Sequence, residues 1–171
     1  MKWVKQSIHY WCPDTKEHKF LGQNVTVAIL DTGISPHPDF KDRILSFRDF
    51  SSTTGSSEKV LFSFSHFSPL IDNSGHGTHV AGILAGSGLL SSGTYAGIAP
   101  FCNLIIGKVL DQNGNGSIKN VINGIQWIRD IYTQFHIRII NISVGTRPDL
   151  SIHQKLLLLN AVESLWILGS S

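Results

Sequence analysis

The sequence of 171 residues predicts an α/β fold built on a mostly parallel sheet. Short apolar runs rich in β-branched residues alternate along the chain with segments of helical periodicity, which is the pattern of strand–helix–strand units. The first run, residues 25–30, carries apolar side chains on both faces, as expected of a strand inside a parallel sheet. A hydrophobic content of 42% with 15% charged residues indicates a globular chain rather than a disordered one.

The first half of the chain contains two expected strands and one expected helix. The run at residues 25–30 ends in Asp-Thr-Gly, and a second, less regular run predicts the next strand. Serine, glycine and proline between the apolar runs favour loops. The expected elements are strands at residues 25–30 and 43–50, a surface loop at 51–73, a helix at 77–85 and a loop at 86–97.

The second half repeats the alternation. Ser117 is expected to cap a helix that reaches Tyr132, because apolar residues recur on one helical face after it. That face consists of Val121, Ile122, Ile125, Ile128 and Ile131. The other expected elements are strands at residues 103–110 and 138–143, a turn at 111–116 and a helix at 153–166.

Charge and targeting signals narrow the classes of partner and location. The net charge is +2 and the basic residues are scattered, so neither a nucleic-acid stripe nor a membrane-binding patch is expected. Residues 1–10 lack the apolar core and cleavage site of a secretory signal, which predicts a cytoplasmic location. A secreted form without a leader, or a truncated secreted form, stays open as the alternative location. Cys12 and Cys102 are expected to be thiols rather than a disulfide framework.

Asp31 is the first candidate for catalysis. It follows the first strand, and the carboxyl ends of strands face the ligand crevice in open α/β sheets. A carboxylate there can accept a hydrogen bond from an imidazole and hold the ring in one tautomer. The alternative is a turn-forming aspartate before Gly33. Asp-Thr-Gly also occurs in aspartic proteases, but those use paired aspartates on β-rich lobes, against which the βαβ pattern argues.

His76 is the second candidate, because it stands between Gly75 and Gly77 at the start of a predicted helix. The glycines keep bulk away from the ring, so it can act as a general base toward a bound substrate. His79 shares a helix face with it, which raises the alternative of a metal-dependent hydrolase. No carboxylate follows at the spacing of a zinc hydrolase, so we expect no metal site and a packed role for His79.

Residues 25–33 and 74–82 together resemble the aspartate and histidine signatures of the subtilases, the subtilisin-like serine peptidases. The similarity continues in four later segments and is nearest to the bacterial intracellular-type branch. These segments are Gly-Ile-Ala-Pro with the strand that follows it, the Asn-Gly-Asn-Gly-Ser turn, Ile-Asn-Ile-Ser-Val-Gly and Ala-Val-Glu-Ser-Leu-Trp. It implies a three-layer subtilisin-like fold and one partial catalytic domain over residues 1–171. Within it, residues 1–23 form a lead-in, 24–166 are subtilase-like, and 167–171 are a non-matching tail.

The resemblance also implies a substrate groove and bears on cofactors. Two segments would flank an extended polypeptide and pair with its backbone; they are Gly114, Asn115 and Gly116, and Ser143, Val144 and Gly145. Plain turn chemistry is the alternative for the two glycines of the first segment.

Subtilases often bind calcium, but residues 86–97 offer hydroxyls without a carboxylate, and Asp39 alone cannot make a site. We therefore expect no cofactor.

The sequence departs from the family where the nucleophile belongs. No segment reads Gly-Thr-Ser-Met-Ala, and no later strand carries the asparagine that donates to the oxyanion. Ser143 belongs to the substrate match, and Ser170 and Ser171 lack the flanking residues of a nucleophile turn. We therefore expect a truncated, incomplete serine endopeptidase domain, inactive alone. The alternatives are a non-catalytic peptide-binding module and a fragment whose partner carries the serine. The strand near residues 139–143 should lie at an exposed edge that promotes self-association.

Overall fold

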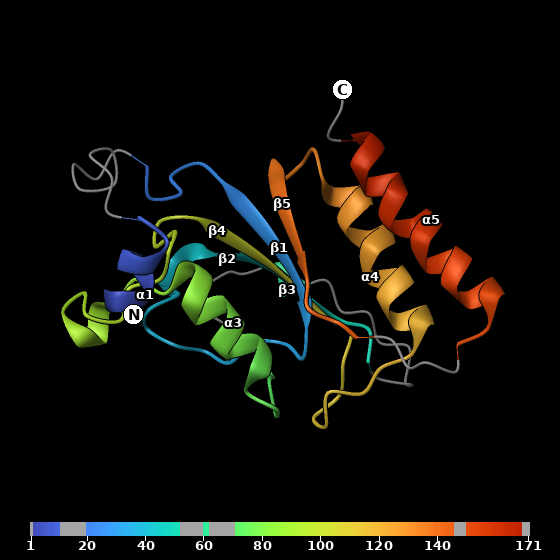
Figure 1. Ribbon diagram of the computed structural model, residues 1–171, viewed down its shortest axis with the longest axis horizontal. Helices are drawn as coiled ribbons and strands as arrows, with labels where there is room; N and C mark the ends of the chain where they lie inside the picture. The colour runs from blue at the N-terminus through green and yellow to red at the C-terminus, as the bar shows by residue number, and fades with distance from the viewer. Residues whose placement is uncertain (1, 11–19, 52–59, 62–70, 146–149, 169–171) are drawn as a thin grey trace.

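The computed structural model describes residues 2–10, 20–51, 60–61, 71–145 and 150–168 (Figure 1). Strands and helices alternate through most of the chain, as the sequence predicts. The elements are α1 (Lys2–Ser7), β1 (Thr26–Asp31), η1 (Lys41–Arg43), β2 (Ile44–Asp49), β3 (Val60–Leu61), α3 (His76–Ala85), η2 (Leu89–Ser91), β4 (Asn103–Lys108), α4 (Ile118–Ile131), β5 (Ile137–Ile142) and α5 (Ile152–Leu168).

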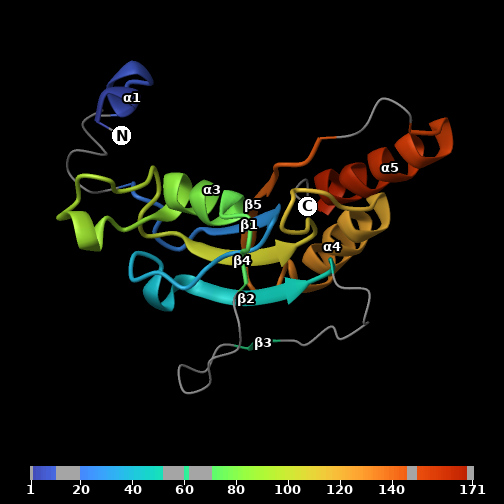
Figure 2. The same cartoon turned by 90° about the horizontal axis from the view of Figure 1, so that it is seen from below.

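The strands form one sheet in the order β3-β2-β4-β1-β5 (Figure 2). The central strand β1 pairs in parallel with β4 and with β5, and β2 pairs in parallel with β4. Only the two-residue β3 runs antiparallel, on the outer side of β2. The prediction of a mostly parallel sheet is confirmed, and the register places Asp31 opposite Lys108 at the carboxyl edge.

Helices cover both faces of this sheet, which gives the expected three layers. Helix α3 lies against one face, and α4 and α5 lie together against the other (Figure 1). All six residues of β1 are buried, since both faces of that strand meet a layer of apolar side chains. Ser117 caps α4 by accepting the Asn120 N–H at 3.1 Å, as predicted.

Two segments differ from the sequence expectation. The stretch at residues 51–73 is not loop throughout, because β3 pairs with Ser46 and Phe47 of β2; residues 52–59 and 62–70 lie outside the described part. The lead-in contains the helix α1, which no periodic pattern in the sequence predicts. A helix of six residues is too short to be stable through helix propensity alone. The segment is held instead by tertiary hydrogen bonds from the Lys5 ammonium to the Gly97 carbonyl (2.8 Å) and from the Tyr10 hydroxyl to the Ile98 carbonyl (2.7 Å).

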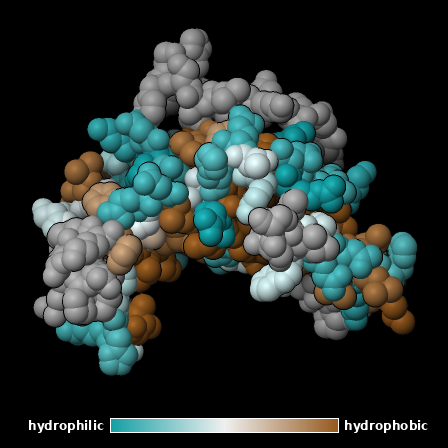
Figure 3. Space-filling view, turned by 90° about the horizontal axis from the view of Figure 1, so that it is seen from above, coloured by the Kyte–Doolittle hydropathy of each residue, from teal (hydrophilic) through white to brown (hydrophobic). Residues whose placement is uncertain are grey.

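The last two elements leave apolar side chains uncovered. Strand β5 lies at the edge of the sheet, as expected, and Ile139 is 52% exposed. Helix α5 is apolar around its circumference, a pattern typical of a helix buried on all sides, yet several large side chains face solvent. They are Ile152, Leu156, Leu157, Leu159, Val162 and Trp166. Figure 3 shows an arched outline with hydrophobic atoms along its inner side and on its right-hand leg, where α5 lies.

Two smaller expectations concern cysteine chemistry and membranes. Cys102 is a buried free thiol, as predicted, and Cys12 lies outside the described residues. Within the described part of the chain, no helix has the length and apolar character needed to cross a bilayer.

Candidate active site

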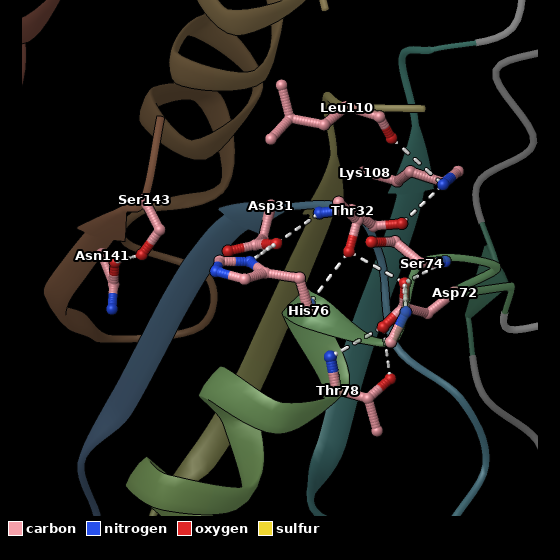
Figure 4. Close-up of polar contacts among 12 residues, drawn as sticks. Asp31, Thr32, Asp72, Ser74, His76, Thr78, Lys108, Leu110, Asn141 and Ser143 are labelled. Carbon is pink, nitrogen blue, oxygen red and sulfur yellow. Dashed lines mark hydrogen bonds and ion pairs between the residues drawn. The ribbon is translucent and has the colours of Figure 1, made fainter. Parts of the chain in front are cut away.

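Asp31 and His76 meet at the carboxyl edge of the sheet, although 45 residues separate them in the chain (Figure 4). The Nδ1 atom of His76 lies 2.7 Å from Oδ1 of Asp31. The same oxygen accepts the N–H of Thr32 at 2.7 Å. Asp31 is fully buried, and its Oδ2 atom has no hydrogen-bond partner among the described residues. Within the described part of the chain, the imidazole and the Thr32 N–H are therefore the two hydrogen-bond partners of this carboxylate, both at Oδ1.

His76 is the first residue of α3, and its side chain is 56% exposed. The hydrogen bond to Asp31 and the charge of that carboxylate raise the pKa of His76, against a small opposing effect of desolvation, and the charge of Asp72 adds to the rise. Because Asp31 can only accept, Nδ1 carries the proton and Nε2 keeps its lone pair in the neutral ring. This is the tautomer that a general base needs.

The junction between β1 and α3 depends on a close backbone approach at Gly77. A Cβ atom at this position would lie 2.3 Å from the Gly33 carbonyl oxygen and 3.2 Å from Oδ1 of Asp31. Only glycine leaves room there, so the helix can bring His76 within reach of the carboxylate. This explains physically why the residue after the histidine has no side chain.

We expect Gly77→Ala to destabilise the protein by about 1–3 kcal/mol, the usual cost of forced overpacking. Gly82→Ala, in the same helix, is the control, because an added Cβ there meets no atom within 4 Å. That substitution should be neutral or stabilise by up to about 1 kcal/mol through helix propensity. Urea denaturation of the two variants measures the difference, and equal stabilities would contradict the close approach.

A cavity of about 840 Å³ opens beside His76. Seven of the eight site residues predicted from sequence line it, namely His76, Gly114, Asn115, Gly116, Ser143, Val144 and Gly145. Asp31 is not among the lining residues. The two predicted substrate segments thus belong to one groove that leads to the imidazole.

Sequence reasoning missed the part of this groove that comes from helices. Ile118 and Val121 of α4, and Gln154 and Leu158 of α5, also line the cavity. The helical periodicity assigned Val121 to the face that packs on the sheet, and residue spacing alone does not show where a cavity interrupts such a face. For α5, the uniform leucine run hides which side faces the groove.

A buried polar cluster beside the imidazole was not predicted from the sequence (Figure 4). Asp72 is only 9% exposed and accepts hydrogen bonds from Thr32 and Thr78. Lys108 is 6% exposed, and its ammonium donates to the carbonyls of Thr32 (2.5 Å) and Leu110 (3.1 Å). The N-cap rule marks the residue directly before a helix, which is Gly75 here, so no local signal in the sequence points to Asp72 three residues earlier.

No serine is paired with the imidazole in the described part of the chain. The ring of His76 makes a single hydrogen bond there, to Asp31. The Ser143 hydroxyl donates instead to Oδ1 of Asn141 at 2.7 Å. The site therefore holds an imidazole with a carboxylate bonded to it, and the described residues place no nucleophile against them.

The residues around Asp39 do not fit a calcium ion. Its carboxylate oxygens accept the N–H groups of Gly88 (3.0 Å) and Leu90 (3.3 Å), and residues 86–97 contain no further carboxylate. Calcium is held by six to eight oxygen ligands, usually with several carboxylates. Among the described residues, no group of three or more His, Cys, Asp or Glu side chains is arranged to hold a metal.

Comparison with known proteins places this geometry in a family. The model of the subtilase family, peptidase S8, matches residues 22–165. The chain belongs to the subtilase family. It is 46% identical over 106 residues to the serine protease AprX of Bacillus subtilis (strain 168), and 38% identical over 130 residues to the major intracellular serine protease of the same organism. These alignments cover 62% and 75% of this subtilase, but only 21% and 36% of the two relatives.

Solved structures agree with the fold. The Clostridium perfringens CspB protease superposes with a TM-score of 0.75 at 26% identity, over 94% of this chain and 37% of that one. Sphericase superposes with a TM-score of 0.66 at 28% identity, over 83% of this chain and 42% of that one. This subtilase chain thus spans less than half the length of these relatives and structures, and it has a subtilisin-like fold over that part.

Proposed function

We propose that these 171 residues supply the general base, its orienting carboxylate and the substrate groove of a serine endopeptidase. The contact of 2.7 Å between His76 Nδ1 and Asp31 Oδ1, at the end of a groove lined by both predicted substrate segments, carries the proposal. Peptidases of the subtilase family act on polypeptides, so the substrate is an extended polypeptide. Its backbone would pair with residues 114–116 on one side and 143–145 on the other.

In the proposed reaction His76 Nε2 removes the proton from a serine hydroxyl, and the serine oxygen attacks the peptide carbonyl. The imidazolium that forms is stabilised by the buried carboxylate of Asp31. His76 then returns the proton to the leaving amine. The attacking serine and the oxyanion donor come from a segment that these 171 residues do not contain, as a covalent continuation or as a complementary chain.

Two finer proposals accompany this function. The 171-residue chain by itself does not hydrolyse peptides, since the Gly-Thr-Ser-Met-Ala segment of the family is not in its sequence. It acts in the cytoplasm, which is supported by the similarity to a Bacillus subtilis protease named as intracellular.

A second function, binding of extended peptides without cleavage, is favoured by one observation: the groove residues stand together without a nucleophile among the described residues.

A serine-directed fluorophosphonate probe separates these functions. The 171-residue chain should remain unlabelled and should not hydrolyse a casein-derived peptide library. Fused to the serine-bearing segment of a related subtilase, it should become labelled and active. Unlabelled but folded fusions that still bind the library would support the binding module. Stoichiometric labelling of the 171-residue chain would contradict the proposed inactivity and require another nucleophile.

A further inference from the structure

We propose that Asp72 is a positioning residue for His76: its buried carboxylate holds the first turn of α3 against the end of β1 and thereby sets the place of the imidazole. The inference rests on the proposed function, because it takes His76 as the general base. Asp72 touches no substrate segment and acts through the helix that carries the histidine.

The first observation is that α3 begins without a cap of its own. Its N-cap residue is Gly75, at φ +83°, which has no side chain to accept a hydrogen bond. The first amide groups of a helix have no intrahelical partner and need acceptors from elsewhere. The Thr78 N–H donates to Oδ2 of Asp72 at 2.8 Å, and the Gly77 N–H donates to the Thr32 hydroxyl at 2.9 Å. The caps of this helix therefore come from outside it.

The second observation is the number of donors around the carboxylate. Oδ1 of Asp72 accepts the Thr32 hydroxyl (2.8 Å) and the N–H groups of Gly75 (2.9 Å) and Ser74 (3.2 Å). Oδ2 accepts both the N–H and the hydroxyl of Thr78, at 2.8 and 2.5 Å. Burial would raise the pKa of Asp72, but the hydrogen bonds from Thr78, Thr32 and Gly75 outweigh it and lower the pKa. The group is thus held as an ionised acceptor.

The third observation is the link through Thr32 to the catalytic carboxylate. The Thr32 hydroxyl donates to Asp72 and accepts from Gly77, while the Thr32 N–H donates to Oδ1 of Asp31. Through its side chain and its backbone N–H, the single residue Thr32 therefore joins the loop carboxylate, the helix and the end of β1 (Figure 4). A loss of the Asp72 acceptor would free the first turn of α3 and lengthen the contact between Asp31 and His76.

The charged groups around this junction come from four elements. Asp31 belongs to β1, Lys108 to β4, His76 to α3 and Asp72 to the loop before α3. Asp31 has the larger influence on the pKa of His76, and the charge of Asp72 acts in the same direction. A variant that keeps both charges but removes the hydrogen-bond link therefore separates positioning from simple charge.

The test measures the pKa of His76 directly and does not rely on catalysis; it uses the 171-residue chain fused to the serine-bearing segment of a related subtilase. The pH dependence of its modification by diethyl pyrocarbonate, resolved by peptide mass spectrometry, gives the midpoint at micromolar concentration. Asp72→Asn should lower this midpoint and speed amide exchange in the first turn of α3 at least about fivefold, the scale of a lost N-cap. Asp39→Asn is the control, because it also removes a carboxylate that accepts two backbone amides, away from His76, and should change neither readout.

Thr32→Val and Thr32→Ser complete the test, and keep it decisive if Asp72→Asn does not fold. The valine variant keeps the charge of Asp72 but removes the hydroxyl link, so it should lower the midpoint and speed exchange; the serine variant should restore both. An unchanged His76 midpoint in Asp72→Asn and Thr32→Val would overturn the proposal, even if stability falls. Failure of the proposed peptidase function would appear separately, as an inactive fusion with a normal His76 midpoint.

Discussion

In a domain completed by a serine-bearing segment, Asp31→Asn is expected to lower kcat about 10⁴-fold with little change in KM. Asparagine nearly preserves the shape of the side chain but can present an N–H to Nδ1, which then loses its proton and leaves Nε2 protonated. The wrong tautomer faces the nucleophile, while the substrate groove is untouched. His76→Ala removes the base itself and should cost about 10⁶-fold, the scale known for subtilisin. Steady-state kinetics on the fusion measures both losses.

Asp49→Asn is the matched control for Asp31→Asn. Asp49 also ends a strand of the sheet, and it accepts the N–H and the hydroxyl of Ser51 at 2.7 Å, outside the groove. Its removal should leave kcat within about twofold, the scatter expected of a surface substitution. Retention of a tenth or more of the activity in Asp31→Asn would remove Asp31 from the mechanism.

The second large effect is expected in the isolated chain, which should self-associate and bind the dye ANS. The edge of β5 and the apolar surface of α5 are open to solvent in the described part of the chain: Ile139 is 52% exposed, Leu156 51% and Leu159 52%. Exposed strand edges and large apolar patches drive association. A complementary serine-bearing segment that pairs with β5 should suppress both signals. Size-exclusion chromatography with light scattering follows the change.

Charge substitutions test whether this surface is the cause. Ile139→Lys and Leu156→Lys should each reduce association and ANS binding in the isolated chain. Leu90→Lys is the control, since Leu90 is 67% exposed but lies in η2, after α3, away from β5 and α5. A sharp monomer peak, no ANS binding and a cooperative thermal transition in the unsubstituted chain would show that it folds autonomously. That result would favour the peptide-binding module.

The sequence predicted those elements whose local pattern and tertiary role agree. The run at 25–30 is apolar on both faces because β1 is buried between two layers, and α4 shows one apolar face because it packs on the sheet. The pairing of Asp31 with His76 followed from two short signatures and from the rule that strand ends face the crevice. Where pattern and environment disagree, as in α5, the expected helix formed but its exposed face could not be assigned.

Sequence by itself thus predicted the buried strand at residues 25–30, the helix capped by Ser117, and Asp31 and His76 as candidate site residues, because each prediction depends on residues near one another in the chain. Only the tertiary structure decided the role of Asp72, the short strand β3, the anchoring of α1, and the part of the groove formed by Gln154 and Leu158. These features arise from contacts across tens of residues. A hydrogen bond or a cavity wall of that kind leaves no periodic signal, since its partners are brought together only when the whole sheet has assembled.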